Sequence, residues 1–114
     1  MLPKANRLRN TREIEKVFRA GRGVKEGFLF LKFMENDLEI SRFAFIVSKK
    51  TSPKAVQRNK IKRRLRDIIR KRMPRIKTGF DLVVIAQKGA GSAKFQEMEQ
   101  AVVRLLEKIK LILI

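Results

Sequence analysis

The segment from Arg58 to Arg72 constrains the fold more than any other part of the chain. Nine of its residues are Lys or Arg, and Asp67 is its only acid. Its apolar residues recur at helical spacing, which predicts an amphipathic helix with a buried stripe formed by Ile61, Leu65, Ile68 and Ile69. The chain must therefore fold so that one side of this helix docks in a core and the other presents a dense cationic surface.

The cationic side of this helix predicts a polyanionic partner. At about 100° per residue, Asn59, Arg63, Arg66 and Arg70 cluster opposite the apolar stripe. Like charges four residues apart destabilise an isolated helix, and the run lacks the alternating signs of a solvated face. The whole chain has a formal net charge of +18. Nucleic acid fits this excess better than solvent or a membrane does, and the predominance of Arg, whose planar fork matches phosphate, favours a folded RNA.

Other secondary-structure elements are expected on both sides of this helix. The sequence predicts helices over residues 10–21 and 95–109, strands over 28–34, 42–48 and 81–87, and a loop over 49–57 that can end in a short further strand. The first two strands are close enough to pair as a hairpin. The expected fold is an α+β sandwich of order α-β-β-β-α-β-α, with helices packed on a four-stranded mixed sheet, in one domain over residues 1–114.

Missing residue types exclude several functions. The chain has no His and no Cys, so the usual zinc sites and nucleophile–base pairs cannot be built. Its eleven acids are scattered among Lys and Arg, which favours surface ion pairing. No run approaches the roughly 18–20 apolar residues that span a bilayer, and the first ten residues lack the apolar part of a signal peptide. We expect a cytoplasmic protein without catalytic residues or metal ligands of its own.

Aromatic residues suggest a second mode of RNA contact. All eight are Phe. Bases of single-stranded RNA stack on aromatic side chains in a sheet groove, which contributes about 1–3 kcal/mol per base. Most of the Phe residues are expected in the core. However, strand residues alternate between faces, so Phe18 and the exposed face of the 28–34 strand are candidates for base stacking.

The residues around the cationic helix form a more specific pattern. Ser48-Lys49-Lys50 end a strand, and Arg58-Asn59-Lys60-Ile61-Lys62-Arg63, followed by Arg66, open the helix. This pattern resembles the signature of the bacterial ribonuclease P protein family. Arg7-Leu8 before the first helix, Val17-Phe18 near its end and the strand from Asp81 fit the same layout, so the resemblance covers almost the whole chain.

The resemblance implies a ribosomal protein S5 domain 2-like fold that binds a large catalytic RNA and the 5′ leader of precursor tRNA. It also implies an endonuclease in which the RNA subunit removes the leader with magnesium held mainly by RNA and substrate. It further implies that the protein needs no obligatory protein partner and does not bind a membrane. The implied RNA-binding residues are Arg58, Asn59, Lys60, Lys62, Arg63, Arg66, Arg70, Lys49 and Lys50, and the implied leader-cleft residues are Phe18, Ile14 and Leu31.

The chain departs from the family pattern at three places. Lys60 replaces an Arg of the motif, which keeps the charge but loses the bidentate fork. Ile14 and Leu31 stand where many members have aromatic residues in the cleft, so leader stacking is expected to depend more on Phe18. The pair Ser52-Pro53 occupies a loop where the family often has Gly, which leaves the conformation of that loop open.

Two other classes of protein stay open at this stage. Another RNA-binding structural protein, such as a ribosomal one, would share the charge and the type of sheet. A membrane-surface protein is suggested by the apolar stretch over residues 102–114. The apolar positions of that stretch follow one stripe until its last turn, which core packing explains better.

Overall fold

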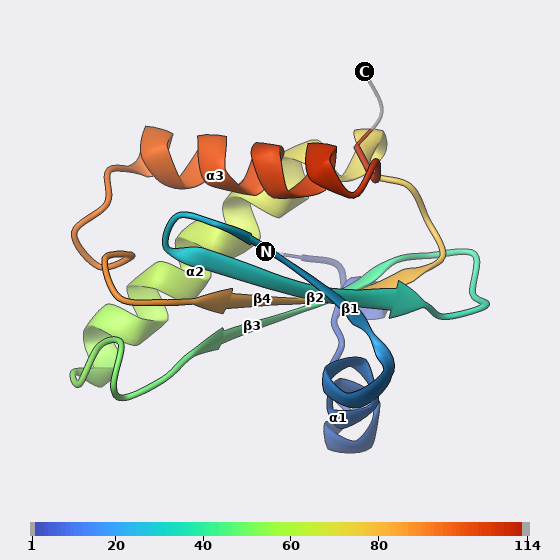
Figure 1. The fold of residues 1–114 in the computed structure, drawn as a ribbon, viewed down its shortest axis with the longest axis horizontal. Helices are drawn as coiled ribbons and strands as arrows, with labels where there is room; N and C mark the ends of the chain where they lie inside the picture. Colours follow the sequence, from blue (N-terminus) through green and yellow to red (C-terminus); the bar gives the residue numbers. More distant parts are fainter. Residues whose placement is uncertain (1, 113–114) are drawn as a thin grey trace.

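Three α-helices pack on a four-stranded mixed sheet in residues 2–112, the part of the chain that this computed structural model describes (Figure 1). The helices are α1 (Thr11–Ala20), α2 (Ala55–Arg72) and α3 (Phe95–Lys108). The strands are β1 (Arg22–Glu26), β2 (Leu29–Glu35), β3 (Arg42–Val47) and β4 (Phe80–Ala86). Short 3-10 turns occupy Lys4–Asn6 and Met73–Arg75. The predicted α+β class, with helices packed on a four-stranded mixed sheet, is confirmed.

The strand order is β1-β2-β4-β3, so the predicted hairpin between residues 28–34 and 42–48 is wrong. β2 pairs antiparallel with both β1 and β4, whereas β3 pairs in parallel with β4. The physical reason lies in β4, whose residues 81–84 are all buried. A strand buried on both faces takes a central place, and β4 therefore separates β2 from β3. α2 is the connection that brings the chain from β3 to its parallel neighbour.

The hairpin lies one element earlier, between β1 and β2. Gly27 makes its tight turn with a φ of 56°, a left-handed conformation that Gly adopts without strain. β1 replaces the further strand predicted within residues 49–57, which form turns and the start of α2. Val24 is the only apolar side chain in β1, so this edge strand has no clear hydrophobic pattern in the sequence.

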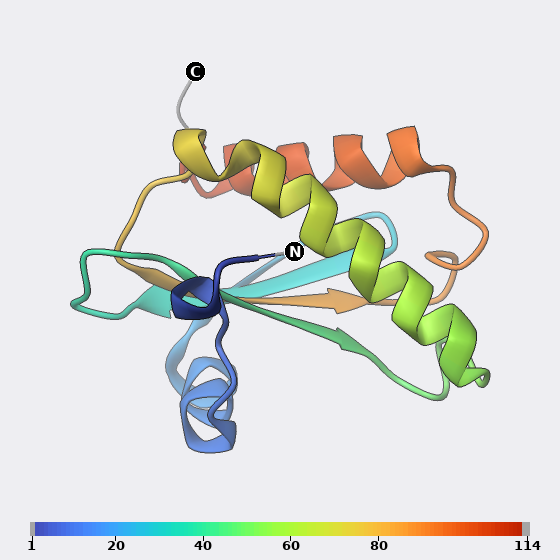
Figure 2. The ribbon, with the colours of Figure 1, turned by 180° about the vertical axis from the view of Figure 1, so that it is seen from behind.

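Two apolar clusters, one on each face of the sheet, hold the layers together. The larger lies between the sheet and the helices α2 and α3. The smaller consists of Leu8, Val17, Ala44 and Val83. Figures 1 and 2 show α2 and α3 covering one face, while α1 stands alone on the other face near one end of the strands. Because α1 is only ten residues long, no helix within residues 2–112 covers the rest of that face.

The end of the described chain packs on the main core. Leu111 is buried, and its carbonyl oxygen accepts a 2.7 Å hydrogen bond from the backbone N–H of Lys77. Ile112 forms an antiparallel bridge with Ile76. This packing weakens the membrane-surface alternative, although residues 113–114 of the stretch that suggested it lie outside the described part. Among residues 2–112, no helix has both the length and the apolar character needed to cross a membrane.

Candidate nucleic-acid interface

α2 has the two-sided character that its sequence predicts. Its apolar stripe is buried in the main core: Ile61, Leu65, Ile68 and Ile69. The opposite side is exposed and carries Asn59, Lys60, Arg63, Arg66 and Arg70, which we call the outward row. Figure 2 shows α2 running diagonally across the molecule with one side turned away from the sheet. The 18 residues of α2 extend over about 27 Å, so the row is long enough to contact several phosphates.

Three other cations of α2 interact within the protein. Arg64 Nη1 donates to the Ala93 carbonyl oxygen at 3.5 Å. Lys71 Nζ lies 5.9 Å from the centre of the Phe95 ring. Arg72 Nη2 forms an ion pair with Glu99 Oε2 at 3.3 Å. These contacts tie α2 to α3 and the segment before it, and the outward row is therefore the candidate RNA surface of the helix.

Arg58 lies outside the outward row. Its Nη1 donates to the carbonyl oxygens of Ser52 at 3.0 Å and Pro53 at 2.7 Å, so its side chain folds back over the loop before α2. Lys49 and Lys50 are exposed in that loop, and Lys62 is half-buried on the helix. The loop conformation left open by the Ser52-Pro53 pair thus depends partly on Arg58.

A second candidate surface lies on the sheet face that carries α1. Phe18 projects from α1 and is 39% exposed, and Ile14 packs partly buried against the smaller apolar cluster. On the strands, Phe30 and Ile46 are the register neighbours of Ile85, and all three are half-buried on this same face. We call these five residues the apolar strip. A partly open apolar surface with two aromatic rings suits the stacking of unpaired bases.

Leu31 lies on the other face of the sheet, so its predicted place in the cleft is wrong. It is 1% exposed and packs in the larger apolar cluster. Successive strand residues point to opposite faces, and Phe30 therefore stands where Leu31 is expected. Gly23 makes room for this ring, because a Cβ at that position would lie 2.8 Å from it. β2 is largely apolar on both faces, but its one lysine, Lys32, lies on the same face as Phe30. This charge was the signal in the sequence for which set of side chains faces outward.

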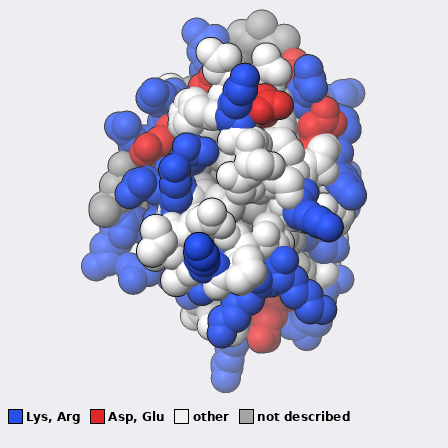
Figure 3. Space-filling view, turned by 90° about the vertical axis from the view of Figure 1, so that its left-hand side faces the viewer, with Lys and Arg blue, Asp and Glu red and all other residues white. Residues whose placement is uncertain are grey.

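A hollow of about 360 Å³ connects the two candidate surfaces. Its lining consists of Leu2, Arg7, Leu8, Arg9, Ile14, Phe43, Ala44, Phe45, Ile46 and Arg66. The N-terminal segment forms one wall, since the backbone N–H of Leu8 donates to the Phe43 carbonyl oxygen at 2.8 Å. Arg66 comes from the outward row and Ile14 from the apolar strip. From the end of the molecule where α2 begins, Lys and Arg side chains surround an uncharged centre (Figure 3).

A cluster of ion pairs fixes α1 on the sheet. Arg42 on β3 donates from Nε and Nη2 to the two carboxylate oxygens of Asp81 on β4, each at 2.8 Å. Its Nη2 also donates to Glu13 Oε2 on α1 at 2.7 Å. The Asn36 side-chain amide donates to Asp81 at 2.9 Å. The hydrogen bonds to Asp81 are the main reason that the pKa of Arg42 is raised above its ordinary value, which keeps this cation charged.

The same cluster engages two acids, Glu13 and Asp81. Asn10 caps α1, because its side-chain oxygen accepts from the backbone N–H groups of Arg12 and Glu13. In a capping box, however, the Glu13 carboxylate would return to the backbone of Asn10, and here it binds Arg42. Asp81 is 5% exposed, so it is not the surface ion pair expected of a scattered acid. Ion pairs between residues this far apart in the sequence leave no local sequence pattern by which they could be predicted.

The carboxylates do not gather into a metal site. Glu26 accepts from Lys108 Nζ at 2.6 Å and lies 3.6 Å from Arg104, and chiefly the Lys108 hydrogen bond lowers the pKa of Glu26 from its ordinary value. Glu13, Asp81 and Glu99 are likewise paired with arginines. No group of three acidic side chains that could hold a metal occurs in residues 2–112. These four carboxylates are thus engaged in ion pairs within the protein.

Comparisons with known proteins give one consistent family. The model of the family described as Ribonuclease P matches residues 2–110. The ribonuclease P protein component of Syntrophomonas wolfei is 39% identical over 108 residues, which cover 95% of this chain and 90% of that one. That of Dehalococcoides mccartyi is 39% identical over 111 residues, covering 97% and 90%.

Solved structures agree with this similarity. The RNase P protein of Staphylococcus aureus superposes with a TM-score of 0.87 at 25% identity, covering 96% of this chain and 99% of that one. The RNase P protein from Thermotoga maritima gives a TM-score of 0.82 at 31% identity, covering 90% and 96%. The similarity of fold thus extends over at least 90% of this chain.

Proposed function

The chain belongs to the ribonuclease P protein family, and on that premise we propose that it binds the catalytic RNA of this tRNA-processing enzyme together with the 5′ leader of precursor tRNA. Binding promotes endonucleolytic removal of the leader and so generates the mature 5′ end of the tRNA. The observation that carries the proposal is the outward row of α2, a continuous cationic surface on a helix whose other side is fixed in the core.

We assign the outward row to the catalytic RNA. Arg63, Arg66 and Arg70 offer planar guanidinium groups for bidentate contacts with phosphates, and each neutralised phosphate releases condensed counterions. The buried stripe fixes the helix on the core, so binding RNA should cost the helix little conformational entropy. Lys49 and Lys50 extend the cationic surface beyond the start of α2.

We assign the apolar strip and the adjoining hollow to the single-stranded leader. Phe18 and Phe30 provide rings for base stacking, and Arg9 and Arg66 at the hollow provide charge for the backbone. This arrangement would place the leader beside the outward row, so that one chain contacts both RNAs. Ile14 supplies apolar contact in place of an aromatic ring.

We assign the hydrolysis itself to the RNA partner. The paired carboxylates of this chain do not offer magnesium a site, so the ions are proposed to be held mainly by the RNA and the substrate. The protein needs no further protein subunit for this role and is proposed to act in the cytoplasm, where its two RNA partners would meet.

Reconstitution tests this proposal. The protein is added to a bacterial ribonuclease P RNA and a precursor tRNA at low magnesium, and cleavage is followed under single-turnover conditions. We expect the protein to raise the cleavage rate, and to do so more for a precursor with a long leader than for one with a one-nucleotide leader. No acceleration with either substrate would reject the proposal and favour an RNA-binding structural protein instead.

The double variant Arg63→Ala/Arg66→Ala tests the assignment of the outward row. Both side chains are exposed, so the fold should persist while affinity for the catalytic RNA falls. Circular dichroism and thermal unfolding serve as the check on folding. An unchanged affinity with an unchanged salt dependence would show that the RNA binds elsewhere.

A further inference from the structure

Arg58 opens the motif that points to RNA, yet its guanidinium group is directed at the protein. One nitrogen, Nη1, reaches the carbonyl oxygens of both Ser52 and Pro53. These two residues immediately precede Lys54, the N-cap of α2, whose side chain makes no capping hydrogen bond. Arg58 therefore joins the first turn of α2 to the loop before it.

The loop is ordered from its other end by Thr51. The Thr51 hydroxyl lies 3.1 Å from the Ser48 hydroxyl and donates to the Ala86 carbonyl oxygen of β4 at 3.3 Å. The backbone N–H groups of Thr51 and Ser52 both reach the Ser48 carbonyl oxygen at 3.1 Å. These contacts form a turn whose exposed tip consists of Lys49 and Lys50.

Ser52 joins the two halves of this arrangement. It is 3% exposed, its hydroxyl donates to Gln57 Oε1 at 3.0 Å, and its carbonyl oxygen accepts from Arg58. A small polar residue can be buried here only because each of its polar groups finds a partner. The loop is thus fastened to β4 through Thr51 and to α2 through Ser52 and Arg58.

We propose that Arg58 is a positioning residue, which holds the Ser48–Lys54 loop against α2 so that Lys49 and Lys50 stand at fixed places beside the outward row. The inference rests on the proposed function, because the two lysines are taken to contact phosphates of the catalytic RNA. Arg58 then contributes to RNA binding through two other cations, and the ordered loop avoids an entropy loss on binding.

Salt dependence of RNA binding separates a positioning role from a direct contact. Loss of one phosphate contact lowers the slope of log K against log [salt] by about 1. Arg63→Ala, an exposed residue of the same helix, is the matched comparison and should lower the slope by about 1. Arg58→Ala should lower it by about 2 or more, because both lysines lose their places. Thr51→Val removes no charge, and it should still lower both the slope and the affinity.

Amide hydrogen exchange of the free protein gives a readout without RNA. Exchange at the Thr51 and Ser52 amides should accelerate at least tenfold in Arg58→Ala and in Thr51→Val, and stay unchanged in Arg63→Ala. Unchanged exchange of these two amides in Arg58→Ala would overturn the inference. A slope loss of only 1 in Arg58→Ala, together with unchanged RNA affinity in Thr51→Val, would overturn it as well. Failure of the wild-type protein to bind the RNA would instead reject the proposed function. If Arg58→Ala does not fold, Thr51→Val decides alone.

Discussion

Phe18 shows how one residue can test the leader site. It is 39% exposed on a helix whose other apolar side chains face the sheet, so its removal should cost little stability. We predict that Phe18→Ala weakens binding of precursor tRNA with a leader by about 1–3 kcal/mol, through the loss of one stacked base. Binding of mature tRNA to the reconstituted enzyme should not change, which equilibrium titration of both RNAs can check.

Leu38→Ala is the matched control for Phe18→Ala. Leu38 is 45% exposed in the connection between β2 and β3 and is not one of the five residues of the apolar strip. Its truncation removes a similar exposed apolar group and should affect neither RNA. Equal losses for precursor and mature tRNA in Phe18→Ala would mean that the residue supports the fold and not the leader.

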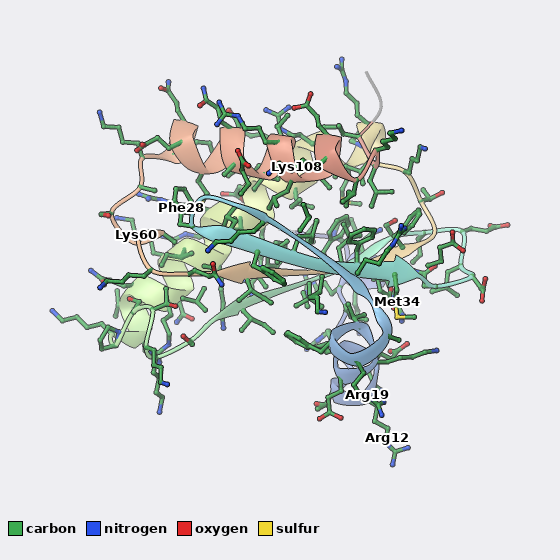
Figure 4. All side chains as sticks on the ribbon, viewed as in Figure 1. Arg12, Arg19, Phe28, Met34, Lys60 and Lys108 are labelled. Atoms are coloured by element: carbon green, nitrogen blue, oxygen red, sulfur yellow. The ribbon has the colours of Figure 1, made fainter. Side chains whose placement is uncertain are left out.

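Arg12 and Arg42 illustrate how one residue type serves two purposes. Arg12 points away from the sheet on the outer side of α1 (Figure 4), as solvated charges do. The Arg42 side chain is 18% exposed and lies between two carboxylates. The net charge of the chain does not distinguish them, and only the second holds elements together.

At the scale of elements, α1 depends on the cluster around Arg42. We predict that Arg42→Ala lowers the free energy of unfolding by on the order of 3 kcal/mol, because it leaves the buried Asp81 carboxylate without its cation. Urea denaturation measures the loss. Arg12→Ala removes the same charge from the outer side of α1 and should change stability by less than about 0.5 kcal/mol. Equal effects of the two substitutions would contradict the role of the cluster.

β1 is tied to α3 by Glu26, and this contact should depend on pH. The pKa of Glu26 is lowered from its ordinary value of 4.5, mainly by the hydrogen bond from Lys108. A carboxylate with a lowered pKa stabilises the fold above its unfolded pKa, and this contribution disappears as the pH falls through the folded pKa. Urea midpoints of the wild-type protein should thus exceed those of Glu26→Gln at pH 7, and the difference should shrink as the pH falls below the ordinary pKa of 4.5. A constant difference down to pH 3 would argue against this ion pair.

The sequence predicts the helices of this fold better than the arrangement of its strands. The 3.6-residue spacing of Ile61, Leu65 and Ile68 specifies both the helix and its buried side. Strand order has no such local code, since pairing is decided by which strands bury both faces. β2 has apolar residues on both faces, and within it only Lys32, on the same face as Phe30, indicates which of Phe30 and Leu31 faces outward. Arg42 and Asp81 are 39 residues apart and meet only once β3 lies beside β4.

The candidate site could be predicted in part. Four members of the outward row follow directly from helical geometry, and the structure exposes all of them: Asn59, Arg63, Arg66 and Arg70. Lys60 is exposed as well, although that geometry did not place it opposite the apolar stripe. Arg58 was grouped with them by motif, although the direction of its side chain depends on the loop before it. Arg9 was not among the expected site residues, because its position depends on the bridge of the N-terminal segment to β3. Phe30 was covered only by the expectation for the exposed face of the 28–34 strand, and its place there depends on sheet register.

At the scale of the whole molecule, the charge of +18 predicts two salt effects of opposite sign. Salt screens the mutual repulsion of the cations, so the thermal unfolding midpoint of the free protein should rise between 50 and 500 mM NaCl. Affinity for the catalytic RNA should fall over the same range. The slope of log K for RNA binding against log [salt] should be about −4 to −5, because six exposed cations can each contact a phosphate. These cations are Lys49, Lys50, Lys60, Arg63, Arg66 and Arg70.

Scanning calorimetry and filter binding in the same buffers measure these two effects. The variant Arg63→Ala/Arg66→Ala should reduce the salt effect on RNA affinity by about 2 in slope. Its unfolding midpoint in low salt should rise slightly, because two repelling charges are removed. An unfolding midpoint that falls with added salt would show that attractive ion pairs outweigh the excess positive charge.

The central position of β4 also determines when the protein can fold. During synthesis, β1, β2, β3 and the whole of α2 leave the ribosome before residue 80, and none of them except β1 and β2 has its partner strand. The sheet closes only when β4 enters between β2 and β3, so most native contacts are distant in sequence and form late. Until then the basic helix is exposed on an unfinished chain, surrounded by the ribosome's own RNA. Rapid completion of the last third of the chain would therefore protect this protein from binding the wrong RNA before it can bind the right one.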